Sequence, residues 1–102
     1  LEMATMGGAR VLGQQARIGS LETGKLADLI VVDMDRPRQV PLFDPVAQVV
    51  YVSRGDDVRT TIVNGRVLMR DRRVLTLDAE RVLADARQAA ALVRTAVGAS
   101  PR

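Results

Sequence analysis

The chain has 102 residues, of which 47% are hydrophobic and 26% charged, and its formal net charge is +3. This composition is typical of a single soluble globular domain, and the longest apolar run, Ala89 to Val93, is far shorter than the roughly 20 residues of a membrane helix. Neither cysteine nor histidine occurs, which excludes disulfides, thiol nucleophiles, and thiolate or imidazole metal ligands from this segment.

The first twelve residues predict a short helix. The residues that share one face at helical spacing are Leu1, Ala4, Gly8, Val11 and Leu12. Gly13 follows at the place where a helix end favours a left-handed residue. Gly7 and Gly8 each weaken the helix by about 1 kcal/mol relative to alanine. We therefore expect this helix to need a surface to pack against.

A connector, Gln14 to Lys25, leads into a predicted strand at Ala27 to Met34. The centre of the strand, Leu29 to Val32, is continuously apolar, as in a strand covered on both faces. Asp28 and Asp33 bracket this run. The sequence offers few other strands to cover it, so the sheet is predicted to be incomplete.

Three prolines between Asp35 and Pro45 argue against a regular element there. Asp44 followed by Pro45 predicts a helix start, with a capping residue and then proline at the first helical position. Val46, Val49 and Val50 then share one face of the predicted helix.

Two β-rich runs within Val58 to Arg70 are separated by Asn64-Gly65, which predicts a hairpin with a type I′ turn. This turn is expected to set Ile62 opposite Val67 and Thr60 opposite Met69. A second reversal at Asp71-Arg72 is expected to return the chain through Val74 and Leu75.

From Thr76 onward the apolar spacing becomes helical. The stripe consists of Ala79, Val82, Leu83, Ala86, Ala89, Ala90, Val93 and Val97. We expect Thr76 to cap this helix, Gly98 to end it and Ala99 to Arg102 to be frayed.

The basic residues do not indicate a nucleic-acid interface, despite the positive net charge. The dense cluster at Arg70, Arg72 and Arg73 contains an aspartate, and the chain has only one phenylalanine and one tyrosine for stacking. We expect neither nucleic acid nor a membrane as a partner. The lack of cysteine agrees with a reducing compartment, so a cytoplasmic location is expected.

Each residue with conceivable chemistry also has an ordinary structural interpretation. Asp28 and Asp33 lie five positions apart on a strand and have no histidine to work with, so hydrogen bonding at the strand ends is favoured over catalysis. The spacing of Gly19 and Gly24 matches no phosphate-binding motif, and turn glycines are favoured. The methionines Met3, Met6 and Met69 are interpreted as core residues. No catalytic, cofactor-binding or metal-binding residue is predicted in this chain.

The terminal helix, Ala79 to Val97, is open to two interpretations. It could bind a partner, or it could cover the remainder of its own fold, and the second is the commoner use of such a helix.

Several segments resemble the amidohydrolase superfamily. Ile18 to Asp33, IGSLETGKLADLIVVD, is similar to the segment that follows the catalytic barrel in that family, and Leu1 to Leu12 resembles the helix just before it. The segments that narrow the likeness are Pro41 to Tyr51, Arg54 to Val58, and Ile62 to Gly65. They resemble the branch that holds methylthioadenosine and S-adenosylhomocysteine deaminases, guanine deaminases and triazine hydrolases.

The resemblance implies an α+β fold, in which the chain forms the C-terminal part of a composite β-sandwich with flanking helices and without the catalytic (β/α)₈ barrel. It implies that residues 1–13 are the helix after the last barrel strand, residues 14–75 the C-terminal strands of the sandwich, and residues 76–102 the final helix and tail. The resemblance also implies that the parent protein binds zinc or another divalent metal. The family's metal ligands lie upstream of this segment, so the segment itself is not expected to hold the metal.

The implied function is that of a non-catalytic portion of a metal-dependent hydrolase, a deaminase or chlorohydrolase of N-heterocycles. The alternative is a free-standing structural or interaction module that reuses the sandwich. Expected partners are the barrel and N-terminal strands of the same polypeptide, with homo-oligomerisation or strand exchange.

Two positions depart from the family pattern. Gly7 stands where the family usually has asparagine, which removes a side-chain hydrogen bond. Arg72 stands where the second reversal usually has glycine, and a left-handed conformation there would cost roughly 1 kcal/mol.

Overall fold

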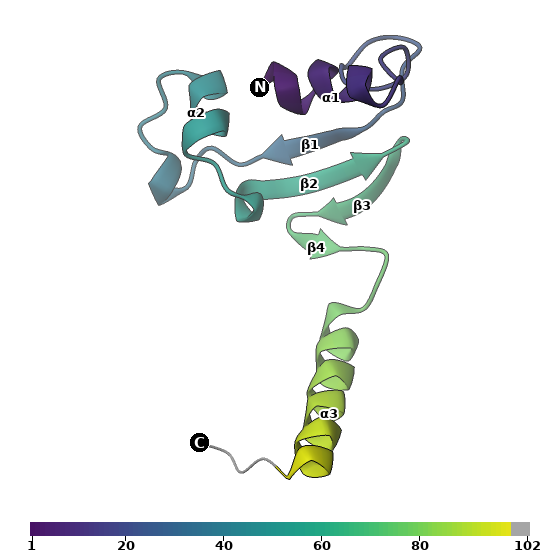
Figure 1. Ribbon diagram of the computed structural model, residues 1–102. Coiled ribbons are helices and arrows are strands. Elements are labelled where there is room, and N and C mark those ends of the chain that lie inside the picture. The colour runs from purple at the N-terminus through teal and green to yellow at the C-terminus, as the bar shows by residue number, and fades with distance from the viewer. Residues whose placement is uncertain (99–102) are drawn as a thin grey trace.

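The computed structural model describes residues 1–98 as an antiparallel sheet with separate helices, which agrees with the predicted α+β class (Figure 1). The helical segments are η1 (Glu2–Ala4), α1 (Met6–Val11), η2 (Pro37–Gln39), α2 (Pro45–Tyr51), η3 (Gly55–Asp57) and α3 (Ala79–Val97). The strands are β1 (Leu29–Val32), β2 (Val58–Val63), β3 (Arg66–Arg70) and β4 (Arg73–Val74), and they lie in this order in one sheet. The predicted fraying of Ala99 to Arg102 lies outside the described residues.

The first helix is interrupted, contrary to the continuous helix expected over Leu1 to Leu12. Thr5 adopts φ −121° and ψ −98°, which separates the single turn η1 from α1. Its amide donates to the Glu2 carbonyl at 3.1 Å, and its hydroxyl donates to the Leu1 carbonyl at 3.1 Å. These local bonds compete with helical ones, as threonine side chains commonly do. Gly13 follows at φ +67°, as predicted.

The β2–β3 hairpin turns at Asn64 and Gly65, whose φ angles of 48° and 75° confirm the expected left-handed pair. Ile62 lies opposite Val67, also as predicted. The second predicted pair is wrong, because Met69 faces Thr61 and not Thr60. The register shifts between the two pairs, as in a β-bulge, and such a shift moves every later pairing by one residue.

Within residues 1–98 the strand β1 is not covered on both faces, which agrees with the prediction of an incomplete sheet. It pairs with β2 on one side and forms an edge of the sheet on the other. Ile30 is 55% exposed and Val31 44% exposed. A continuous apolar run indicates that the strand becomes covered but not which part of a polypeptide covers it.

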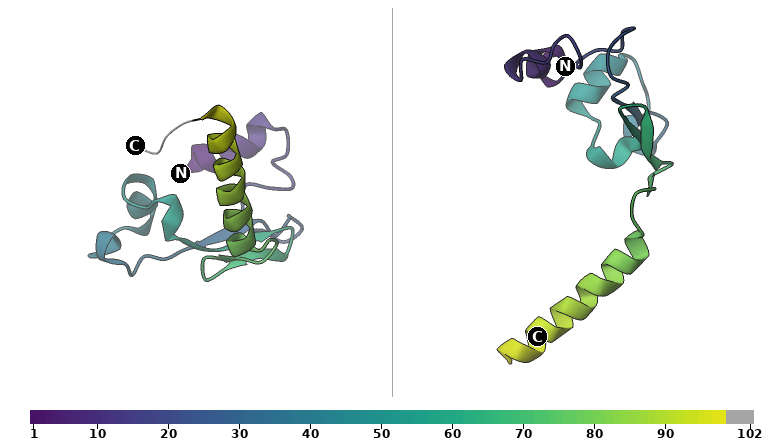
Figure 2. Two further views of the ribbon diagram at one scale, coloured as in Figure 1. Left: turned by 90° about the horizontal axis from the view of Figure 1, so that it is seen from below. Right: turned by 90° about the vertical axis from the view of Figure 1, so that its right-hand side faces the viewer.

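The helix α2 begins as predicted. Asp44 caps it, because its Oδ1 accepts hydrogen bonds from the amides of Val46 at 2.9 Å and Ala47 at 3.4 Å. The proline-containing segment before it holds only the single turn η2. The helices α1 and α2 lie on the same side of the sheet (Figure 2).

The start of α3 differs from the prediction. Asp78 and not Thr76 caps the helix, since its Oδ1 accepts a hydrogen bond from the Arg81 amide at 3.1 Å. A carboxylate is a strong acceptor for the free amides of the first turn, and it also suits the positive end of the helix dipole. Gly98 ends α3 at φ +66°, as expected.

The molecule is extended and has almost no core of its own. Its radius of gyration is 19.2 Å, whereas a compact chain of this length has about 13 Å. The helix α3 runs away from the sheet (Figures 1 and 2), and every residue from Arg70 to Gly98 is exposed. Ala9 is the one buried hydrophobic residue within residues 1–98. The interpretation of Met3 as a core residue is therefore wrong for this chain, because η1 leaves its side chain exposed.

Candidate functional site

A buried carboxylate, Asp57, is the centre of a polar cluster. It lies at the end of η3, directly before β2, and is fully buried. Its Oδ2 accepts hydrogen bonds from the Arg54 amide at 2.8 Å and from Gln39 Nε2 at 2.9 Å. The Arg38 guanidinium donates to both carboxylate oxygens at 2.8 Å. The Arg54 amide and then Arg38 lower the pKa of Asp57, against the opposing effect of burial.

The Asp57 cluster joins four consecutive elements. Gln39, on η2, is fully buried, and its Nε2 also donates to Ser53 Oγ at 2.9 Å. The Gln39 carbonyl accepts from Gln48 Nε2, on α2, at 2.8 Å. The cluster thus links η2, α2, η3 and the start of β2. Since the carboxylate is enclosed and its oxygens already accept four hydrogen bonds, it holds the fold and is not placed to bind a substrate or metal.

Sequence reasoning did not identify this cluster. Asp57 lies in the family-like segment Arg54 to Val58, and Arg38 and Gln39 lie in the proline-containing segment before α2. The partners are separated by 18 and 19 residues, so no local spacing indicates the contact.

Asp28 and Asp33 bond at opposite ends of β1, which confirms their interpretation as strand-end hydrogen-bonding residues. Asp28 Oδ1 accepts from the Asn64 amide in the hairpin turn at 2.7 Å. Asp33 Oδ1 accepts from the Asp35 amide at 3.0 Å. The Asp35 amide and the Arg72 guanidinium lower the pKa of Asp33.

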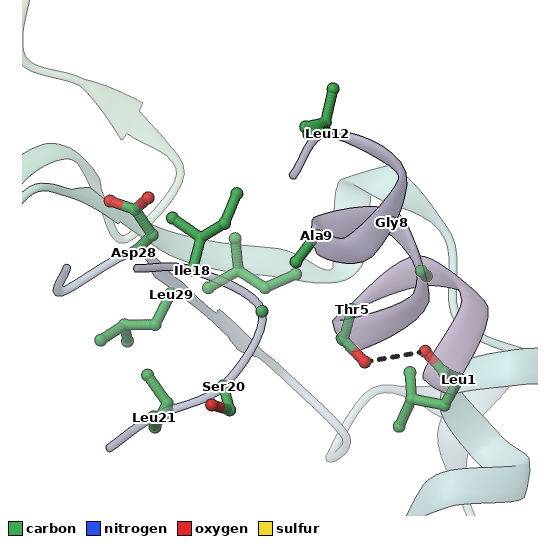
Figure 3. A pocket seen from close by; sticks show the side chains of 13 residues that line it. Leu1, Thr5, Gly8, Ala9, Leu12, Ile18, Ser20, Leu21, Asp28 and Leu29 are labelled. Carbon is green, nitrogen blue, oxygen red and sulfur yellow. Dashed lines mark hydrogen bonds between the residues drawn. The ribbon is translucent and has the colours of Figure 1, made fainter. Parts of the chain in front are cut away.

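An apolar groove of about 700 Å³ lies between α1, the following loop and the start of β1 (Figure 3). The apolar side chains that line it belong to Leu1, Ala4, Ala9, Leu12, Ile18, Leu21, Leu29 and Ile30. Among the lining residues within 1–98, Asp28 has the one charged side chain, and its Oδ1 already accepts a hydrogen bond from the Asn64 amide. The groove therefore suits apolar side chains better than a charged ligand.

Gly19 allows the loop to approach α1 closely beside this groove. Its φ is +97°, and a Cβ there would lie 2.8 Å from Ala9 Cβ and 2.9 Å from Met6 Sδ. Gly24 also has a positive φ, +90°, so both positions behave as the turn glycines that were predicted. Lys25 closes the loop, with Nζ 2.7 Å from Ser20 Oγ and 3.1 Å from Glu22 Oε2.

The residues of this chain do not fit a catalytic zinc site. The sequence lacks imidazole and thiolate ligands entirely. Across residues 1–98, no three carboxylates come together in an arrangement that could hold a metal ion. No helix in the same range has the length and apolar character needed to cross a membrane. That no residue here is catalytic stays a prediction.

Known proteins resemble this chain over most of its length. The sequence profile of the amidohydrolase family matches residues 1–68. A 5-methylthioadenosine/S-adenosylhomocysteine deaminase of Syntrophobacter fumaroxidans is 47% identical over 94 residues, which are 92% of this chain and 22% of the relative. A 5′-deoxyadenosine deaminase of Methanosarcina acetivorans is 53% identical over 90 residues, 88% of this chain and 20% of the relative. The chain thus spans about a fifth of the length of these relatives.

Solved structures share the same arrangement of elements. An adenosine deaminase from Xanthomonas campestris with bound zinc matches 92% of this chain and 21% of its own, with a TM-score of 0.81 and 36% identity. An atrazine chlorohydrolase from Arthrobacter aurescens complexed with zinc matches 85% of this chain and 19% of its own, with a TM-score of 0.74 and 32% identity.

Proposed function

This chain belongs to the amidohydrolase family, and from that premise we propose that it is the non-catalytic C-terminal portion of a metal-dependent hydrolytic deaminase. The observation that carries the proposal is the 47% identity, over 92% of the chain, to a deaminase of methylthioadenosine and S-adenosylhomocysteine. The 53% identity to a 5′-deoxyadenosine deaminase supports the same substrate class. The parent enzyme would therefore act on the amino group of an adenosine derivative.

The proposed reaction replaces an amino group on a carbon of the heterocycle by an oxygen from water and releases ammonia. In metal-dependent hydrolases the ion supplies an activated water at neutral pH. Both solved structures described above contain zinc, which supports zinc or a similar divalent ion in the parent. Because this chain has neither histidine nor cysteine, we assign the ligands and the reacting groups to the remainder of the parent.

We further propose that the remainder of the same polypeptide completes a composite β-sandwich around this sheet. The exposed edge strand β1 and the apolar groove beside α1 support this, because uncovered apolar surface and unpaired strand edges favour association. A cytoplasmic location of the parent is part of this proposal and rests on the cysteine-free sequence.

A chlorohydrolase of triazines is the second candidate, favoured by the match to the atrazine chlorohydrolase structure. Its identity of 32% is lower than the 47% and 53% of the two deaminases, so deamination is preferred. The alternative of a free-standing module requires a stable core within the chain. The single buried hydrophobic residue within residues 1–98 argues against it.

The test is to express the full-length protein that contains this chain and to measure ammonia release from methylthioadenosine, 5′-deoxyadenosine and guanine, and chloride release from atrazine. We expect ammonia release from an adenosine derivative, lost on chelation and restored by zinc. Chloride release alone would favour the second candidate. The isolated chain serves as the control, and chelator-sensitive turnover by it would contradict the non-catalytic assignment.

A further inference from the structure

We propose that α3 docks, through one apolar face, on an apolar surface of the same polypeptide outside this chain. The residues of this α3 apolar face are Val82, Leu83, Ala86, Ala90, Val93 and Val97. The inference rests on the proposed function, since it requires a parent protein longer than this chain.

The α3 apolar face is uncovered within residues 1–98. Val82, Leu83, Val93 and Val97 are each more than half exposed. The opposite side of the helix carries polar residues, including Gln88 and Thr95. A helix with one apolar and one polar side buries the apolar side against another element in a folded protein.

Local signals define both ends of α3 without help from the sheet. Asp78 accepts a hydrogen bond from the Arg81 amide at 3.1 Å, and Gly98 ends the helix in the left-handed conformation. Most of the stability of a helix in a protein nevertheless comes from packing its apolar side. The helix is thus specified locally, and the surface that it packs on must be supplied from elsewhere.

The sheet of this chain does not supply that surface. The short connector from Leu75 to Asp78 is exposed and carries α3 away from β4 (Figures 1 and 2). Every residue of α3 is exposed, so neither its apolar nor its polar side is covered by β1 to β4.

The length of the similar proteins indicates that the α3 apolar face is covered by the same polypeptide and not by a second copy. The match to the adenosine deaminase structure covers 92% of this chain, so it includes most of the 19 residues of α3. The match, which has a TM-score of 0.81, is therefore not limited to the sheet. Since the match spans only 21% of that protein, most of its chain is available to cover the helix.

Hydrogen exchange on the full-length protein tests this proposal. In the wild-type protein we expect the α3 amides to exchange at least about tenfold more slowly than in a variant that carries Val82→Asp and Val93→Asp. The matched control places the same two charges on the polar side, Gln88→Asp and Thr95→Asp, and should exchange like the wild type. Slow exchange in the wild type should persist on dilution, because docking within one polypeptide does not depend on concentration.

Two results would overturn the proposal. Both are measured on the wild-type protein, so they can be obtained even if the variants do not fold. Fast exchange of α3 in the full-length protein would show that its apolar face is not covered. Protection that disappears on dilution, together with dissociation of an oligomer in light scattering, would assign the face to a second copy. Ammonia release measured on the same sample tests the proposed function separately. If the protein is inactive but its α3 amides are protected, the docking proposal stands and the deaminase proposal is wrong.

Discussion

The guanidinium of Arg72 donates a hydrogen bond to Asp33 Oδ2 at 3.1 Å and so ties the turn after β3 to the end of β1, 39 residues earlier in the chain. Arg72 and the preceding Asp71 have φ angles of 66° and 48°, which non-glycine residues seldom adopt. Asp71 accepts from Arg59 Nε at 2.7 Å, and Arg72 Nε donates to the Asp56 carbonyl at 3.1 Å. Side chains at both turn residues therefore hold a backbone conformation that is unfavourable by itself.

Arg72→Ala and Arg72→Gly separate the two effects in this turn. Both variants lose the contacts to Asp33 and Asp56, but only glycine removes the penalty of the left-handed conformation. We expect the alanine variant of the full-length protein to have a free energy of unfolding lower by about 1 kcal/mol than the glycine variant. Urea denaturation measures this difference, and equal midpoints would show that Arg72 is not left-handed in solution.

Replacement of the buried carboxylate by Asp57→Asn should destabilise the protein and change the pH dependence of its stability. The folded-state pKa of Asp57 is lowered from the ordinary value of 3.8, so its ionised form stabilises the fold at higher pH. This contribution is lost as the pH falls below 3.8 through the lower folded pKa. We expect the variant to have a lower thermal midpoint at neutral pH and a flatter decline below this value.

Asp56→Asn is the matched control for the preceding variant. Asp56 also pairs with Arg38, at 3.3 Å, but its side chain is exposed, and exposed ion pairs contribute little to stability. Its thermal midpoint should stay close to that of the wild type. Equal losses in the two variants would mean that burial of Asp57 does not matter.

Gly65→Val should destabilise the β2–β3 hairpin by about 1 kcal/mol or more, because a β-branched residue tolerates positive φ poorly. Gly55→Val is the control, since Gly55 is exposed, has no positive φ and has no neighbour within 4 Å of a new Cβ. We expect the control to remain within roughly 0.5 kcal/mol of the wild type in denaturation. An unchanged midpoint for Gly65→Val would place the turn elsewhere.

Gly19→Ala should cost more than Gly24→Ala. Both glycines have positive φ, so the two substitutions share the backbone penalty. Only at Gly19 would the new Cβ lie within 3 Å of Ala9 and Met6. We expect an additional loss of about 1–3 kcal/mol from overpacking. Unfolding of the two variants under identical conditions gives the difference, and equal values would contradict the close packing of this loop on α1.

The isolated chain should self-associate or exchange strands if it folds. The edge strand β1 is exposed, and the described residues contain almost no core. A second copy would then cover surfaces that we propose to be covered by the remainder of the parent in the intact protein. Light scattering at micromolar concentration checks this, and a compact, cooperative monomer would count against it and in favour of a free-standing module.

The sequence by itself determined the elements whose signals are local. Asn64-Gly65 specifies the hairpin, Asp44-Pro45 the start of α2, and Gly98 the end of α3, because each signal depends on backbone preferences within a few residues. Where two local signals compete, the prediction was wrong: Asp78 replaced Thr76 as the cap of α3.

Only the tertiary structure decided the pairing of Thr61 with Met69, the buried cluster around Asp57 and the exposure of α3. Arg38 and Asp57 lie 19 residues apart, and Asp33 and Arg72 lie 39 apart, so no local pattern relates them. An apolar face in the sequence predicts that a strand or helix packs against another surface. It does not predict which surface that is, because burial requires contact with a second element. For β1 and α3 the second surface does not belong to residues 1–98, and the chain alone therefore leaves both of them exposed.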